Sequence, residues 1–359
     1  MLSSDETKNA EVGVNIAETD WDKTPAELGY RFPPEWSAHA ATLAGWPFDD
    51  VYWEGQLEVA RNDFETLVSA VARFEPVRLA VADDEARADA ERRFSLQNVE
   101  IYGLELDDVW FRDIAPLFVK NAQGELAATD WLFNGWGNKY RWLKDTRVPA
   151  KLAKDMSIKR FEIPVVMEGG ALDINGAGEC LTTRQCLLNP NRNPDLSKSE
   201  LEQYLQAYLG VTKIIWLGGG LEGDKTDGHV DTITRWANDR TVVTSVCEDE
   251  SDSNYAPLAE NLAILRRLEK YEVLELPLPK KRMDLDGERL PLTYANFYVG
   301  NGFVVVPTYQ DANDERALDI LRGAFPTREV IGLNATGLIT GGGAFHCVTQ
   351  QVPKGTKHG

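Results

Sequence analysis

The stretch NFYVGNGFVVVPTY, residues 296–309, contains the pattern on which the predicted fold rests. Two apolar runs flank the turn sequence GNG, which is typical of a β-hairpin. A helix is predicted next, at about 313–323, and the short apolar strand EVIGL follows it. Together these segments predict one ββαβ unit.

The same order of elements occurs in three earlier parts of the chain. The hairpin-type segments are APLFVKNAQGELAATDW (115–131), GALDINGAGECLTT (170–183) and HVDTITRWANDRTVVTSV (229–246). The helices predicted after them span 147–156, 197–209 and 256–270, and the strands FEIPVV, TKIIWL and EVLELPL come next. The N-terminal part fits with ATLAGWP, a helix near 56–73 and VRLAVAD. The turns recur about every 60 residues, which indicates an internal repeat.

Five such units predict a closed α/β architecture, because radial closure protects the strand edges of a repeat. The last strand, within FHCVTQQVP, is then expected to pair with an N-terminal strand and close the ring. We expect residues 1–28 to form a loose leader, since they are polar with little periodicity. Residues 29–359 are expected to form a single catalytic domain.

The composition narrows the class of function. The chain has 359 residues and a formal net charge of −19, which disfavours nucleic acid and anionic membranes as partners and is compatible with a small cationic substrate. No apolar run is long enough for a membrane span, and no signal peptide is recognisable. The four cysteines form no CxxC pair, so we predict a cytoplasmic protein without a metal site. The oligomeric state is open, and a homo-oligomer is compatible with the sequence.

Polar residues of catalytic type gather where the units begin, in WFRD (110–113), MEGG (167–170), DGHVD (227–231) and GGGAFHC (341–347). If the units are arranged radially, equivalent positions converge at the centre. The residues expected to meet there are Asp113, Glu168, His229, Asp231 and Cys347.

Cys347 follows three glycines, Gly341, Gly342 and Gly343, which permit close backbone approach and suit a presented nucleophile. A buried cysteine at the start of a strand is the alternative. His229 and Asp231 lie two apart on a predicted strand and would share a face, with His229 as general acid/base or as a hydrogen-bonded structural residue.

Four further predictions concern the other histidines and cysteines and one tryptophan. His346 is expected to point to the face of its strand opposite Cys347, and His39 to be a packing or hydrogen-bonding residue. Cys180, Cys186 and Cys247 lie in apolar contexts and are expected to be structural. Trp110, close to Asp113, is either a platform for a flat cation or a core residue.

Six ordered runs carry a resemblance to a known family. They are RFPPEWSAHAATLAGWP (31–47), WFRDIAPLFV (110–119), FNGWGNKY (133–140), MEGGALDINGAGECLTTRQCLLNPNRNP (167–194), GDKTDGHVDTITRW (223–236) and GGGAFHCVTQQVP (341–353). With them the chain resembles the agmatine deiminase and bacterial peptidylarginine deiminase family, within the guanidino-group modifying superfamily. The resemblance implies a five-bladed pseudosymmetric α/β propeller.

The resemblance also implies roles for individual residues. Cys347 corresponds to the nucleophile and His229 to the general acid/base, while Asp113 and Asp231 correspond to the carboxylates that grip the guanidinium. Trp110 lines the pocket, and Glu168, Lys225, Gly342 and Gly343 are assigned to substrate binding. The implied reaction is hydrolytic deimination through a covalent thiouronium-type intermediate, converting agmatine to N-carbamoylputrescine and ammonia with no cofactor.

One departure from the family pattern bears on the substrate. Agmatine deiminases commonly have an acid four residues before the histidine, near the distal amine of the substrate, and here that position is Lys225. A lysine repels an amine and attracts a carboxylate, so arginine or a peptidyl arginine is an alternative substrate. A Lys225 side chain that points into solvent is the structural alternative.

Three other functions remain open. An amidinotransferase would use the same thiol with an amine as acceptor, and ammonia release without an acceptor distinguishes it from a deiminase. A non-catalytic binding protein is disfavoured by the joint presence of Cys347, His229, Asp113 and Asp231. A cysteine protease would need an oxyanion hole and a peptide groove, neither of which the sequence indicates.

Overall fold

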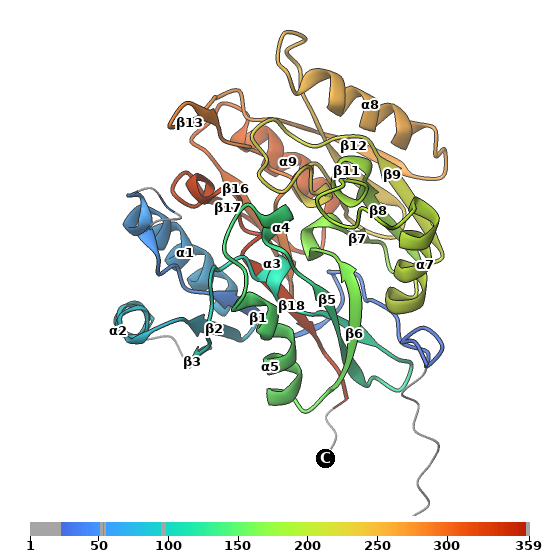
Figure 1. Ribbon diagram of the computed structural model, residues 1–359. Coiled ribbons are helices and arrows are strands. Elements are labelled where there is room, and N and C mark those ends of the chain that lie inside the picture. The colour runs from blue at the N-terminus through green and yellow to red at the C-terminus, as the bar shows by residue number, and fades with distance from the viewer. Residues whose placement is uncertain (1–22, 51–52, 54, 95–97, 357–359) are drawn as a thin grey trace, which may run out of the picture.

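A computed structural model describes residues 23–50, 53, 55–94 and 98–356, and it has a mixed α/β fold (Figure 1). Its described residues contain four three-stranded sheets and one four-stranded sheet, as well as one small two-stranded hairpin. The hairpin is formed by β13 (Asp284–Leu285) and β14 (Glu288–Arg289).

The four three-stranded sheets share one topology, in which an antiparallel pair is followed by a parallel pair. Their strands are β4 (Leu117–Lys120), β5 (Leu126–Leu132) and β6 (Lys159–Val166); β7 (Asp173–Ile174), β8 (Glu179–Thr183) and β9 (Lys213–Leu217); β10 (Thr234–Trp236), β11 (Thr241–Val246) and β12 (Glu272–Pro277); and β15 (Tyr298–Gly300), β16 (Phe303–Thr308) and β17 (Glu329–Asn334).

A helix connects the two parallel strands of each sheet, as parallel pairing requires. These helices are α5 (Val148–Asp155), α7 (Lys198–Leu209), α8 (Tyr255–Arg266) and α9 (Asp314–Ala324). The ββαβ repeat is thus confirmed, with each of these helices starting within one residue of its predicted start. Figure 1 shows α1, α7 and α8 toward the outside of the molecule and the short α3 near its middle.

The four-stranded sheet joins the two ends of the described chain. Its order is β18 (Thr349–Pro353), β1 (His39–Gly45), β2 (Val77–Val81) and β3 (Val99–Gly103). The antiparallel pairing of β18 with β1 confirms the predicted contact of the C-terminal strand with an N-terminal one. Helices α1 (Leu57–Ala72) and α2 (Asp84–Arg93) connect its parallel strands; α2, β3 and the β13–β14 hairpin were not predicted.

The remaining helices are short and lie in loops between sheet strands. They are α3 (Phe111–Ile114), α4 (Gly135–Asn138) and α6 (Arg184–Leu187), with the 3₁₀ turns η3 (Asp145–Arg147), η4 (Gly169–Ala171), η5 (Val230–Thr232) and η6 (Leu338–Gly341).

Two predicted strand boundaries are wrong. His229 and Asp231 do not lie on a strand, because η5 spans Val230–Thr232 and β10 begins only at Thr234. Cys347 is likewise outside a strand, because β18 begins at Thr349. In both places the buried Asn296 side chain hydrogen-bonds the backbone, at the carbonyl of Asp231 and at the N–H of His346, so the alternation rule of a strand does not apply.

Most of the predicted leader lies outside the described residues. Its described end forms turns, in which the Ala26 N–H donates to the carbonyl of Ala207 on α7 at 3.0 Å. Within the described part of the chain, no helix is long and apolar enough to cross a membrane.

The sheets pack through buried apolar clusters and a few buried polar joints. At the joint between β1 and β15, the Glu75 carboxylate accepts from the Asn301 N–H at 2.8 Å and contacts His39 Nδ1 at 3.0 Å. Thr42 also donates to Glu75, which is 1% exposed. His39 is therefore the hydrogen-bonding residue that the sequence predicted.

Replacing Glu75 with glutamine is expected to lower the free energy of unfolding by about 3 kcal/mol, because an amide donor then faces donors in a buried site. Urea denaturation measures the change. Glu329→Gln is the control, since Glu329 forms only an exposed pair with Arg73, and it is expected to shift stability by less than about 1 kcal/mol. Equal stabilities of the two variants would contradict this role of Glu75.

Candidate functional site

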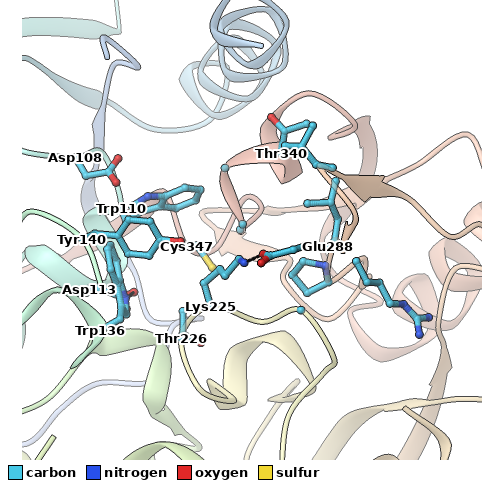
Figure 2. Close-up of a pocket in the computed structure, with 18 residues that line it drawn as sticks. Asp108, Trp110, Asp113, Trp136, Tyr140, Lys225, Thr226, Glu288, Thr340 and Cys347 are labelled. Carbon is cyan, nitrogen blue, oxygen red and sulfur yellow. Dashed lines mark hydrogen bonds and ion pairs between the residues drawn. The ribbon is translucent and has the colours of Figure 1, made fainter. Parts of the chain in front are cut away.

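A cavity of about 240 Å³ opens where loops from several sheets meet (Figure 2). The residues that line it are Asp108, Trp110, Asp113, Trp136, Tyr140, Gly223, Lys225, Thr226, Leu285, Glu288, Arg289, Leu290, Pro291, Thr340, Gly341, Gly342, Gly343 and Cys347. Six of the predicted site residues are therefore at this cavity: Trp110, Asp113, Lys225, Gly342, Gly343 and Cys347.

The Cys347 thiol lies at the cavity and is nearly buried, with the residue 5% exposed. Asn296 Nδ2 lies 3.2 Å from its sulfur, and Asn296 Oδ1 accepts from the backbone N–H of His346 and of Cys347. Asn296 thus fixes the position of the cysteine from the start of the hairpin quoted first. No pattern in the sequence indicates this role, since Asn296 lies in an apolar run.

The glycines before Cys347 serve close packing, as predicted. A Cβ at Gly343 would lie 2.7 Å from the Trp110 ring and 3.1 Å from the Cys347 sulfur. Gly342 has a φ of +100°, a conformation that favours glycine. The loop therefore brings its backbone against both the thiol and the Trp110 ring.

Asp113 is placed by α3 and held from two sides. Its Oδ1 accepts from the Gly170 N–H at 2.8 Å, and its Oδ2 accepts from Trp136 Nε1 at 2.9 Å. Burial raises the pKa of Asp113, and the charges of Asp231 and Glu168 add to this, while His229 opposes it. Trp136 was not predicted as a site residue, although it lies within the quoted run FNGWGNKY.

Asp231 is fully buried and contacts the thiol. Its Oδ2 lies 3.7 Å from Cys347 Sγ and 2.6 Å from His346 Nδ1. Its Oδ1 has no hydrogen-bond partner in the described structure. Burial acts to raise the pKa of Asp231, but the hydrogen bond and charge of His346 outweigh it, so the pKa is lowered.

The prediction that His346 points away from Cys347 is therefore wrong. Both residues reach the same oxygen of Asp231, because the chain between η6 and β18 is a turn. The other nitrogen of His346, Nε2, lies 2.6 Å from a carboxylate oxygen of Glu35. Glu35 was not predicted, although it lies within the quoted run RFPPEWSAHAATLAGWP.

His229 is fully buried between two carboxylates. Its Nδ1 lies 3.8 Å from Asp113 and its Nε2 lies 3.8 Å from Glu168, and neither nitrogen has a hydrogen-bond partner in the described structure. Burial acts to lower the pKa of His229, but Asp113 and then Cys186 and Glu168 outweigh it, and the pKa is raised well above its usual value.

Glu168 is not at the cavity surface, although it was predicted to bind substrate. It is fully buried behind His229, where its Oε1 accepts from Arg192 Nε at 2.5 Å. Burial acts to raise the pKa of Glu168, but His229 and Arg192 lower it. Glu168 therefore faces His229 directly, and it can act on a bound substrate only through the imidazole ring of His229.

Cys186 is buried as predicted, but its surroundings are ionic. Its sulfur lies 3.9 Å from Glu168 Oε2, and ligand-type atoms of Glu168, Cys186 and His229 lie within 4.8 Å of one another. The sequence could not indicate this group, since its members come from three separate segments. Arg192, bound to Glu168, places a cation beside it and disfavours a metal ion there.

The electrostatics of the site favour a cation with N–H donors. Asp231 Oδ1 is a buried acceptor without a partner among the described residues, and oxygens of Asp113 and Asp231 lie on one face of Gly170, 3.1 Å and 3.0 Å from where a Cβ would stand. A buried thiol completes the set, and the charges of Asp231 and Asp113 add to burial in raising its pKa. Such a site suits a small, planar cation that binds next to a buried thiol.

Comparison with known proteins identifies the family. The sequence model of a protein family, the Porphyromonas-type peptidyl-arginine deiminases, matches residues 31–353, and the chain belongs to this family. A Legionella pneumophila protein named "Putative agmatine deiminase" is 38% identical over 341 residues, covering 93% of this chain and 97% of that protein.

Solved structures agree with this assignment. The agmatine deiminase of Enterococcus faecalis matches with a TM-score of 0.88 and 30% identity, covering 92% of this chain and 98% of that one. A C. jejuni agmatine deiminase variant with substrate bound matches with a TM-score of 0.86 and 33% identity, covering 91% and 97% of the two chains. An amidinotransferase from Microseira wollei, 12% identical with a TM-score of 0.54, shares the fold.

Gly170 is a site residue that the sequence analysis did not single out. A Cβ there would lie 2.5 Å from His229 Nδ1, 3.0 Å from Asp231 Oδ2 and 3.1 Å from Asp113 Oδ1. Only a glycine lets the backbone pack this closely against all three groups.

Gly170→Ala is expected to lower kcat/KM by about a hundredfold or more, because the methyl group displaces His229 and both carboxylates. Overpacking of this kind destabilises by about 1–3 kcal/mol, so the variant should still fold. Steady-state kinetics and thermal unfolding measure the two effects. Gly323→Ala on α9, where a Cβ meets nothing within 4 Å, is the control and should keep full activity.

Proposed function

We propose that this protein hydrolyses the guanidino group of agmatine, giving N-carbamoylputrescine and ammonia, with Cys347 as nucleophile. The observation that carries the proposal is a buried, unpartnered acceptor, Asp231 Oδ1, on the carboxylate that contacts the Cys347 thiol. The names of the relatives and solved structures support agmatine as the substrate.

Binding follows from the geometry of the two carboxylates. Asp113 and Asp231 lie close together on one face of Gly170 and can each accept N–H bonds from one guanidinium. Trp110 and Trp136 form apolar walls of the cavity, and Trp136 holds Asp113 in place. Two fixed acceptors orient the central carbon of the guanidinium toward the sulfur and remove the entropy of alignment from the barrier.

The raised pKa of Cys347 means that the free site holds a thiol, and the bound cation is what favours the thiolate. The thiol proton passes to water as the cation binds. The thiolate then attacks the guanidinium carbon and forms a C–S bond. His229, protonated because its pKa is raised, gives a proton to the departing nitrogen, and ammonia leaves as the C–N bond breaks.

Hydrolysis of the thiouronium uses the same histidine as a base. His229, now neutral, takes a proton from water, and the hydroxide adds to the carbon. The C–S bond breaks, the thiolate is released, and the ureido product passes its extra proton to solvent. His229 Nδ1 is the nitrogen suited to both transfers, because it lies toward Asp113 and Asp231 while Nε2 faces Glu168.

The proposal extends to the architecture and the compartment. The five sheets are the blades of a pseudosymmetric propeller, and residues 29–359 form one catalytic domain; the shared sheet topology and the β1–β18 pairing support this. The four free cysteines support a reducing, cytoplasmic location.

Cys347→Ala is expected to abolish ammonia release from agmatine, because it removes the sulfur that forms the bond to carbon. Asp113→Asn and Asp231→Asn are each expected to lower kcat/KM by at least about a hundredfold, because each removes a charged contact with the guanidinium. Coupled assays of ammonia and of the ureido product measure this. Near-normal turnover by Cys347→Ala would contradict covalent catalysis. Ammonia that is released only when an amine acceptor is added would indicate amidino transfer.

Alkylation of Cys347 in the free enzyme is expected to be slow near pH 7 and to accelerate toward pH 9 and above, because a raised pKa leaves little thiolate at neutral pH. Iodoacetamide labelling read by mass spectrometry measures the rate. Cys347→Ala gives the background from Cys247, which is partly exposed. A rate that is already maximal at pH 6 would show that the thiolate forms without substrate.

A further inference from the structure

The mouth of the cavity carries an ion pair that the proposed reaction does not use. Lys225 lies in the loop before η5, Glu288 lies on β14, and both line the cavity that contains Cys347. Their side chains form a salt bridge, which Figure 2 shows as a dashed line among the residues that line the cavity. The lysine that replaces the expected acid thus comes with an acid from a different segment.

The side chains of this pair are free to change partners. The Lys225 side chain is 40% exposed and that of Glu288 is 67% exposed. An exposed pair of this kind contributes about 0–1 kcal/mol, so a ligand with matching charges displaces it readily.

The backbone that carries the pair is held in place. The carbonyl of Lys225 accepts from Lys139 Nζ at 2.8 Å, and Arg289, next to Glu288, binds Asp252 at 2.7 Å. A Cβ at Gly223 would lie 1.9 Å from the Arg289 carbonyl, so the loop of Lys225 packs directly against the hairpin of Glu288. One cation and one anion are therefore carried on backbone segments that are held next to each other.

The other charges at the cavity do not duplicate this pair. Arg289, the other cation among the lining residues, is bound to Asp252 and Glu222. Asp108 is buried, and burial raises its pKa to about 7. Two cations line the cavity among the described residues. Arg289 is paired with carboxylates outside the lining, whereas Lys225 is paired with Glu288, an exposed residue of the lining itself.

A lone amine and a zwitterion use this pair differently. The amine of agmatine would bind Glu288 and leave Lys225 without its partner. An α-amino acid would bind Glu288 through its ammonium and Lys225 through its carboxylate, so both charges are paired again. In arginine the same four-carbon chain separates the guanidino group from the amine as in agmatine, so both substrates place that nitrogen alike.

We propose that this site also deiminates guanidino α-amino acids such as arginine, with Lys225 binding the α-carboxylate and Glu288 the α-ammonium. The proposal rests on the proposed function, since it uses the same thiol chemistry. The C–N bond of the guanidinium breaks, water supplies the oxygen of the new C–O bond, and the products are a ureido amino acid and ammonia.

Four substrates separate the two contacts. Arginine carries both groups, agmatine carries the amine alone, 5-guanidinopentanoate carries the carboxylate alone, and butylguanidine carries neither. Ammonia release from each is measured with the purified full-length protein. We expect arginine to be turned over with a kcat/KM within about tenfold of agmatine, and butylguanidine to be the poorest substrate.

Substitutions then assign each contact. Lys225→Gln is expected to lower the arginine-to-agmatine ratio of kcat/KM about tenfold or more, which is the size of one charge-assisted hydrogen bond. Glu288→Gln is expected to lower agmatine relative to 5-guanidinopentanoate by a similar factor. Lys225→Glu should reverse the preference toward agmatine. Lys151→Gln on α5, whose lysine is paired with Asp155 outside the cavity, is the matched control and should leave all four ratios unchanged.

The outcomes distinguish this inference from the function on which it rests. Turnover of agmatine without turnover of arginine, or a Lys225→Gln variant that keeps the wild-type ratio, would overturn the zwitterion subsite and leave agmatine deimination intact. No turnover of any of the four substrates would overturn the proposed function itself.

Discussion

The central constraint on this structure is the pairing of charges that are buried together. Glu35 accepts from Arg235 at 2.9 Å and from the Val299 N–H at 2.7 Å, and lies 2.6 Å from His346, which in turn holds Asp231. A buried carboxylate without such partners is strongly unfavourable, so these contacts must form together. They come from the loop before β1, from β10, from β15 and from the segment before β18, and therefore tie the two ends of the chain to its middle.

The same constraint leaves the site incomplete in one respect. The network satisfies one oxygen of Asp231 and leaves the other buried without a partner among the described residues, next to a thiol that is kept neutral. A cation with N–H donors supplies the missing partner and also favours the thiolate. In the proposed mechanism, binding of the cation and activation of the thiol are therefore one event, which restricts attack to ligands that carry the positive charge. An uncharged polar ligand gains less binding free energy at this site, because it lacks the positive charge.

Much of the fold could be predicted because its signals are local. The GNG turn in 296–309 and its counterparts mark the hairpins, and the helices predicted at 197–209 and 256–270 are present as α7 and α8. The strand boundaries at His229 and Cys347 failed, because η5 and the turn before β18 are held by buried side chains from other segments. Asn296, Gly170 and Trp136 were missed as site residues for the same reason, since each acts through a residue far away in the sequence.

The sequence by itself determined the repeat, the order of the motifs and the chemical types of Cys347, His229, Asp113 and Asp231, since periodicity, turn residues and side-chain chemistry are read along the chain. Only the tertiary structure decided what each of these groups faces. It placed Glu168 behind His229, paired Glu288 with Lys225, and left the buried Asp231 Oδ1 without a hydrogen-bond partner among the described residues. The physical reason is that pKa, burial and hydrogen-bond partners depend on groups brought together through space, and those groups lie up to hundreds of residues apart in the sequence.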